Sequence, residues 1–257
     1  MTNKKTLETK CILADRCKSA GDAVKCTELC SAYAQVHSAT GRHSLADIPR
    51  DYALTTIRNS PVRAEQPEVY RLIDAYISTF DRQFDEEDEP IRSVYLYSRN
   101  PGTGKTTTAA ALLNEWIAAH YVGSVKRGMT PERKPGYFFD VNRWQALFNR
   151  IYMSSGDRRD ELAGEFERQR TNAERATFAV FDDIGVRETS EGFRAHLHDV
   201  INYRVSERLP TVYTSNVTIE ELPELFGEER LADRIRDLCV EITFEGESRR
   251  GNRKKTK

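Results

Sequence analysis

Seven consecutive residues, Pro101-Gly102-Thr103-Gly104-Lys105-Thr106-Thr107, have the types and spacing of a loop that binds the phosphates of a nucleotide. Glycines let backbone N–H groups close around phosphate oxygens, and a helix that begins after the loop adds the positive end of its dipole. Lys105 would reach the β- and γ-phosphates, and the Thr106 hydroxyl would ligate Mg²⁺. We therefore predict a nucleoside triphosphate site, with ATP and Mg²⁺ as its ligands.

The loop departs from the full pattern G-x-x-x-x-G-K-[ST] at its first position, where Arg99 stands in place of glycine. A left-handed turn at Arg99 would be strained. We therefore expect the entrance of the loop to differ from the usual one.

Two carboxylates, Asp182 and Asp183, end the apolar run of residues 177–181. Beside a phosphate loop, Asp182 would hold Mg²⁺ through its water shell, and Asp183 would orient and deprotonate the attacking water. The alternative is a strand that simply runs into a polar turn.

Asn216 follows the β-rich run of residues 210–215. In an open parallel sheet, ligands lie beyond the carboxyl ends of the strands. An amide there would hold the attacking water or the γ-phosphate, and the alternative for Asn216 is a purely structural turn.

Arg230 and Arg234 share one helix face by their i,i+4 spacing. Such arginines commonly pair with nearby carboxylates. In an oligomer, one of them would instead reach a neighbouring subunit's site as an arginine finger and neutralise the charge that develops on the transferred phosphoryl group.

From residue 91 onward, apolar strand patterns alternate with helical patterns, which predicts a parallel sheet with helices on both faces. The strands are expected at 93–98, 136–141, 177–182, 210–215 and 239–244. The helices are expected at 68–77, 105–120, 142–154, 158–175, 189–208 and 218–226.

Composition adds bounds on partners and compartment. The 39 Lys+Arg and 40 Asp+Glu residues nearly cancel, so the whole chain has no bias toward nucleic acid, although the tail 249–257 is basic. No apolar run approaches the roughly 20 residues of a membrane span, and we expect a cytoplasmic protein. We divide the chain into an N-terminal domain (1–45), a connector with a helix (46–90), an ATPase domain (91–248) and the tail.

Four of the five cysteines, Cys11, Cys17, Cys26 and Cys30, lie in the first 45 residues. Thiolates suit zinc, but the spacing has no tight C-x-x-C pair. The same segment shows a helical spacing of apolar residues, and free cysteine packs as a small hydrophobe. A helical core lined by cysteines is therefore the favoured interpretation, with zinc as the alternative.

The order of these parts resembles an AAA+ ATPase, with a P-loop core and no C-terminal lid domain. Three features are similar to replicative helicase loaders of the DnaC/DnaI type and to the related IstB-type transposition helper ATPases. These are Asn202-Tyr203-Arg204 with Pro210-Thr211, the run Thr214-Ser215-Asn216, and the connector residues 48–52.

The resemblance implies a role for each matching residue. Lys105 and Thr106 correspond to the loop lysine and the Mg²⁺ hydroxyl, Asp182 and Asp183 to the metal and water-activating acids, and Asn216 to the sensor of the γ-phosphate. Arg234 is the best match to the finger that acts across subunits, with Arg230 as its rival.

The resemblance also implies a function, the ATP-dependent loading of a hexameric replicative helicase onto single-stranded DNA by an oligomer whose N-terminal domain binds the helicase. DNA contacts are expected from Arg143 and Arg150, whereas Trp144, Leu147 and Phe148 are expected to pack in the core. The alternatives are a transposition helper that binds duplex DNA, and a nucleotide-gated scaffold with little hydrolysis.

Overall fold

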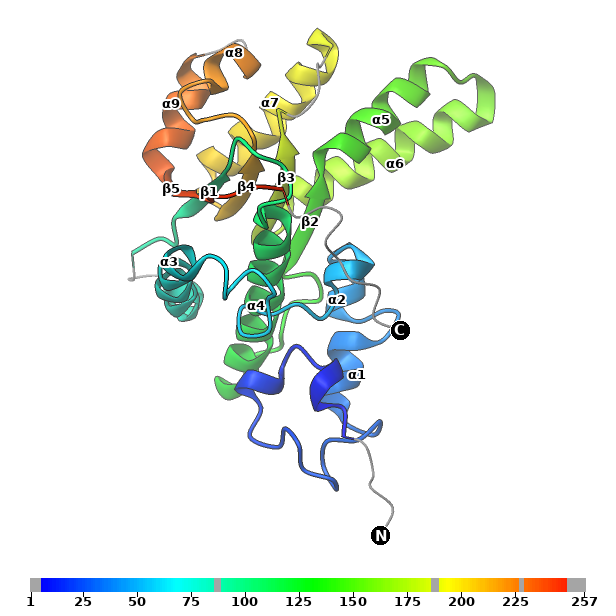
Figure 1. The fold of residues 1–257 in the computed structure, drawn as a ribbon. Helices are drawn as coiled ribbons and strands as arrows, with labels where there is room; N and C mark the ends of the chain where they lie inside the picture. Colours follow the sequence, from blue (N-terminus) through cyan, green and yellow to red (C-terminus); the bar gives the residue numbers. More distant parts are fainter. Residues whose placement is uncertain (1–5, 86–88, 186–189, 227–228, 249–257) are drawn as a thin grey trace.

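The structure is a computed structural model that describes residues 6–85, 89–185, 190–226 and 229–248, apart from the side chains of residues 225, 226, 230 and 231. It is an α/β fold in which one sheet carries helices on both faces, preceded by a small N-terminal region (Figure 1). The predicted fold class is confirmed.

The sheet has five parallel strands in the order β2-β3-β4-β1-β5. They are β1 (Ser93–Tyr97), β2 (Gly136–Asp140), β3 (Phe178–Ile184), β4 (Thr211–Ser215) and β5 (Cys239–Thr243). Because the strands are parallel, their carboxyl ends share one edge of the sheet. Strand β4 lies between β3 and β1, so this edge places the residues after β4 between the acids of β3 and the loop after β1.

The helices follow the predicted alternation with the strands. They are α1 (Ser31–His37), α2 (Arg42–Leu45), α3 (Pro67–Ile77), α4 (Lys105–Lys126), α5 (Val141–Tyr152), α6 (Gly156–Arg175), α7 (Glu191–Ser206), α8 (Leu222–Phe226) and α9 (Glu229–Leu238). Short 3₁₀ helices occupy Glu8–Lys10, Ala14–Arg16, Arg50–Tyr52 and Ser78–Phe84. In the part of the chain that the structure describes, no helix is long and apolar enough to cross a membrane.

The two faces of the sheet bury separate apolar clusters. Val94 and Leu96 of β1 pack with α3, α4 and the N-terminal region, whereas Tyr95 between them packs with α5, α6, α7 and α9. This alternation follows from the two-residue period of a strand. Burial on both faces explains why the strands read as apolar runs.

Several predicted boundaries shift, and two of the shifts bear on packing or on the site. Helix α4 continues past residue 120 to Lys126, and in this extension Gly123 packs closely against the Phe84 ring; a Cβ atom at Gly123 would lie 2.3 Å from Phe84 Cε2. Strand β3 does not end at Asp182 but runs through Asp183 to Ile184, with a register shift against β4 between Phe181 and Ile184.

The continuous helical face expected near residues 7–17 does not form. Two separate 3₁₀ turns occupy this stretch instead. Contacts from distant residues hold the turns: the Leu7 N–H donates to the Cys26 carbonyl at 3.2 Å, and the Ile12 N–H donates to His37 Nε2, also at 3.2 Å. A helix over residues 7–17 would need the Ile12 N–H for an internal bond, and here His37 takes that donor instead.

The N-terminal region docks on α4 through charged side chains. The Arg42 guanidinium donates to the carbonyls of Pro131 and Glu132 and lies over the Tyr121 ring of α4. Arg16 pairs with Glu115 of α4 at 3.6 Å. Because Glu115 also accepts the Ile57 N–H at 3.3 Å, α4 positions the connector as well.

Candidate nucleotide-binding site

The predicted phosphate loop joins β1 to α4. Gly102 and Gly104 have left-handed backbone angles, φ 76° and 106°, and Gly104 is the N-cap of α4. The non-glycine residues with positive φ are Asp47, Asp183 and Arg208 in the described part of the chain. Arg99 is not among them, so the chain avoids the left-handed turn that would be strained at this position.

The connector covers the loop in a way that the sequence did not predict. A Cβ atom at Gly104 would lie 2.6 Å from Cγ1 of Val62, which is itself buried. Glycine at this position is therefore required twice, by its backbone angle and by the close approach of Val62. No local signal in residues 57–63 marks Val62 for this role.

Lys105 and Asn216 lie side by side. The Lys105 ammonium donates to Asn216 Oδ1 at 2.6 Å and to the carbonyls of Ser98 and Asn100 at 3.1 and 3.2 Å. Only 5% of Lys105 is exposed. The two residues are far apart in sequence, and the neighbouring positions of β1 and β4 bring them together.

Thr106 and Asp182, the two predicted Mg²⁺ ligands, are also in contact. The Thr106 hydroxyl lies close enough to the Asp182 carboxylate to favour its charged form. Burial raises the pKa of Asp182 to about 7, and the charge of Asp183 adds to this rise. A hydroxyl beside a buried carboxylate is a donor set that Mg²⁺ accepts, and a cation would offset the cost of the buried charge. The residues present therefore fit the expected ion.

Asp183 lies at the bulge of β3 and has a left-handed backbone, φ 61°. Its carboxylate accepts a hydrogen bond from Asn142 Nδ2 at 3.4 Å. Asp183 is partly exposed, whereas Asp182 is buried. The two adjacent acids therefore lie in different environments. Side chains alternate in any strand, and the bulge additionally changes the direction in which Asp183 points.

Arg234 lies on α9 and is exposed. Its guanidinium donates to Asn202 Oδ1 at 2.6 Å and to Ser206 Oγ at 3.3 Å, both on α7. The side chain of Arg230 lies outside the described residues. These hydrogen bonds hold Arg234 against α7. They do not connect it to Lys105 or Asp183 of its own chain.

Comparisons with known proteins give matches for part of the chain. The family described as IstB-like ATP binding protein matches residues 144–257, a range that includes both aspartates, Asn216 and Arg234 but not the phosphate loop. The chain is also distantly similar to the DnaC and DnaI helicase loaders.

The replicative helicase loader DnaC of Escherichia coli K12 is 27% identical over 155 residues, which cover 60% of this chain and 55% of that protein. DnaI of Bacillus subtilis is 26% identical over 190 residues, 68% of this chain and 52% of that protein. The chain thus spans about half the length of the curated relatives that it matches.

Solved structures agree on the fold. The crystal structure of the DnaC helicase loader superposes with a TM-score of 0.53 at 19% identity, over 77% of this chain and 100% of that one. The crystal structure of DnaI superposes with a TM-score of 0.52 at 20% identity, over 79% and 100%. The chain therefore shares its α/β fold with these proteins.

Arg204, one of the residues that suggested the family, has a structural role within the range that the IstB-like family matches. It is fully buried. Its guanidinium donates to the carbonyls of Ala173, Glu174 and Ala176 at the end of α6, to the Pro210 carbonyl, and to the Thr211 hydroxyl at the start of β4. Burial lowers its pKa to about 10. A cation at a helix C-terminus is favourable, so Arg204 joins α6, α7 and β4.

Trp144, Leu147 and Phe148 of α5 pack in the core, as predicted. Trp144 is fully buried and stacks on Phe166 with ring centroids 4.3 Å apart. Arg143 and Arg150 are exposed, and Arg143 forms a long ion pair of 3.8 Å with Asp47. Both arginines therefore lie on the exposed face of this helix.

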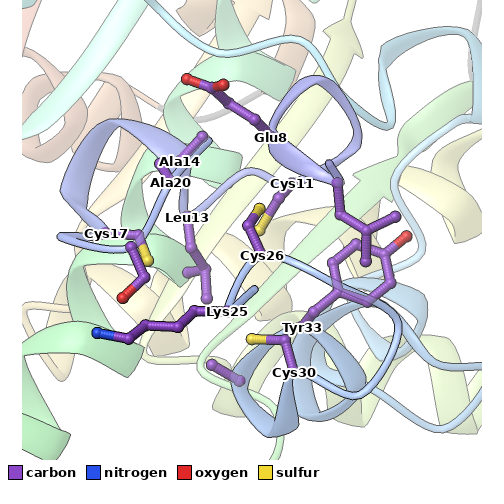
Figure 2. Close-up of a pocket in the computed structure, with 13 residues that line it drawn as sticks. Glu8, Cys11, Leu13, Ala14, Cys17, Ala20, Lys25, Cys26, Cys30 and Tyr33 are labelled. Carbon is purple, nitrogen blue, oxygen red and sulfur yellow. The ribbon is translucent and has the colours of Figure 1, made fainter. Parts of the chain in front are cut away.

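The four N-terminal cysteines line one pocket (Figure 2). All four are free thiols. Burial raises the pKa of Cys11 to about 11, and the charges of the other three thiols add to the rise. No group of three or more His, Cys, Asp or Glu side chains within the described ranges is arranged to hold a metal ion. A measurement of bound zinc in the protein and in Cys26→Ser tests the alternative of a zinc site. If the two contain the same amount of zinc, Cys26 does not bind the metal, and the interpretation of these cysteines as packing residues is supported.

Proposed function

We propose that the protein hydrolyses ATP at the carboxyl edge of its sheet. The observation that carries this proposal is the convergence of Lys105 with Asn216 and of Thr106 with Asp182. These pairs come from three neighbouring strands, and one of each pair belongs to the phosphate loop. These two contacts could form without a loop of left-handed glycines. Such a loop directs backbone N–H groups toward one point, and this arrangement suits a bound phosphate.

Each residue then has a chemical task. The loop N–H groups and Lys105 bind and orient the phosphates, and Thr106 with Asp182 would hold Mg²⁺, which neutralises phosphate charge when bound. Asp183, partly exposed and bonded to Asn142, would accept the proton of the attacking water. Asn216 would exchange its bond with Lys105 for one with the γ-phosphate or the water.

Lys105→Ala tests the binding step. We expect ATP affinity to fall about 100-fold, since truncating a buried charge that pairs with a ligand costs about 2–5 kcal/mol. Equilibrium binding of a fluorescent ATP analogue measures the change. Lys126→Ala, an exposed lysine at the other end of α4, is the matched control and should bind as the unchanged protein does. Equal affinity of the two variants would refute the site.

The homology supports a role in loading a hexameric replicative helicase, with residues 1–45 as the part that binds the helicase and an oligomer formed on it. ATP would favour the assembly, and hydrolysis would release it. The full chain should copurify with a replicative helicase in the presence of ATP. The match to the IstB-like family supports a second candidate, a transposition helper, which would bind duplex DNA with no helicase present.

The tip of the α5–α6 hairpin offers a surface for single-stranded DNA. Tyr152 is 70% exposed, and its ring rests edge-on against Phe148 with centroids 4.9 Å apart, so it is held while its remaining surface faces solvent. Arg150 is exposed on the same helix end. An aromatic ring beside a cation is the usual platform on which an unpaired base stacks.

We expect Tyr152→Ala to weaken binding of single-stranded DNA about tenfold, because stacking of one base on an aromatic ring contributes about 1–3 kcal/mol. Fluorescence anisotropy of a labelled oligonucleotide measures the loss. Tyr203→Ala, which removes an exposed tyrosine of α7, serves as the control and should have no effect. A loss in both variants would point to a general change of the surface.

A further inference from the structure

The hydroxyl of Thr214 contacts both acids of the site at once. Thr214 lies on β4 and is fully buried. Its Oγ1 donates to Asp182 Oδ1 at 2.7 Å and accepts the backbone N–H of Asp183 at 2.9 Å. One hydroxyl therefore uses its donor and an acceptor lone pair on two consecutive residues of the neighbouring strand.

These bonds replace the sheet ladder where it breaks. The register of β3 against β4 shifts between Phe181 and Ile184, and Asp183 there has φ 61°. A left-handed non-glycine residue is strained and persists only when its surroundings hold it. The next residue of β4, Ser215, donates to the Ile184 carbonyl at 2.7 Å, so two adjacent hydroxyls hold the two sides of the bulge.

We propose that Thr214 is a positioning residue of the ATPase site, which fixes the Asp182 carboxylate beside Thr106 and holds the bulge that aims Asp183. This inference rests on the proposed ATP hydrolysis. Thr214 touches neither phosphate nor water in the arrangement described above. It acts through the two acids, because without its hydroxyl Asp182 loses a donor and the Asp183 N–H loses its acceptor.

The chain offers a close control for this role. Thr211 is also on β4 and fully buried, and its hydroxyl likewise accepts a bond, from Arg204 Nε at 2.8 Å, and donates one, to the Leu209 carbonyl at 3.0 Å. It lies at the opposite end of the strand from the acids. Thr214→Val and Thr211→Val thus remove the same chemistry from the same strand.

The experiment measures ATP affinity at equilibrium with and without Mg²⁺, and turnover as a function of Mg²⁺ concentration. We expect Thr214→Val to raise the Mg²⁺ concentration for half-maximal turnover about tenfold, in line with the loss of about 10–100-fold when an outer-shell partner of a metal ligand is removed. ATP affinity without Mg²⁺ should be unchanged, and the gain in affinity on adding Mg²⁺ should shrink. Thr214→Ser should restore both quantities.

Thr211→Val should lower the melting temperature but leave the Mg²⁺ concentration for half-maximal turnover unchanged. A Thr214→Val protein with the Mg²⁺ dependence of Thr211→Val would overturn the inference. The proposed function is judged separately, by ATP binding. If the unchanged protein binds ATP and Lys105→Ala does not, the proposed function stands even when the inference about Thr214 is overturned. If neither protein binds ATP, the proposed function itself fails. Should Thr214→Val not fold, Thr214→Cys, which has a weaker hydrogen-bonding group of similar volume, is measured in the same way.

Discussion

Asp183→Asn is expected to lower ATP turnover about 10²–10⁴-fold, the range that a positioned general base contributes, while ATP affinity changes little. The amide keeps the shape of the side chain, so the contact with Asn142 and the bulge of β3 can persist. It cannot accept a proton from water. A phosphate-release assay measures turnover, and the binding assay used for Lys105→Ala measures affinity.

Asn142→Ala separates proton transfer from positioning. It removes the side chain that donates to Asp183 at 3.4 Å but leaves the carboxylate, so turnover should fall far less than in Asp183→Asn. Turnover that is equally low in the unchanged protein and in Asp183→Asn would instead favour a nucleotide-gated scaffold with little hydrolysis.

Asp183→Asn, combined with Arg234→Ala, also tests whether the site is shared between subunits. Arg234→Ala should lower turnover and leave ATP binding intact if its guanidinium acts on a neighbouring subunit. A mixture of Arg234→Ala and Asp183→Asn proteins would then regain activity, because some interfaces combine an intact Asp183 with an intact Arg234. A mixture with no gain would remove the support for a finger that acts across subunits.

Arg204→Met is expected to destabilise the fold by about 3–5 kcal/mol, because it leaves several buried carbonyls without a donor and each such group costs about 1–3 kcal/mol. Methionine fills much of the volume but leaves the carbonyls of Ala173, Ala176 and Pro210 without their donor. For a chain of this size, that loss lowers the melting temperature by about 10 °C. Thermal unfolding monitored by circular dichroism checks the value.

Arg175→Met is the matched control for Arg204→Met. Arg175 is exposed at the last turn of the same helix α6, and surface substitutions usually stay within about 0.5 kcal/mol. Arg204→Lys should be intermediate, since an ammonium keeps the charge but cannot present the planar fork of donors. A melting temperature of Arg204→Met equal to that of Arg175→Met would show that the guanidinium is dispensable.

The helices and strands of the sheet were predictable because their signals are local. Residues 93–97 and 178–181 are short apolar runs, and a run of this kind next to turn residues indicates a strand buried on both faces. The stretch near residues 7–17 has a helical spacing too, yet it forms two 3₁₀ turns. There the hydrogen bonds come from Cys26 and His37, and no short window of sequence contains such partners.

The sequence by itself determined which chemical groups the candidate site has: a glycine loop with Lys105 and Thr106, two aspartates and an amide, each in or directly after an apolar strand. The tertiary structure decided how these groups are held. The order of the strands places β4 between β3 and β1, so that Asn216 meets Lys105 and Thr214 meets both acids. Arg204 and Val62 act through contacts with residues 28 to 42 positions away. Such contacts depend on register and on which elements adjoin, and these follow from packing of the whole chain rather than from local pattern.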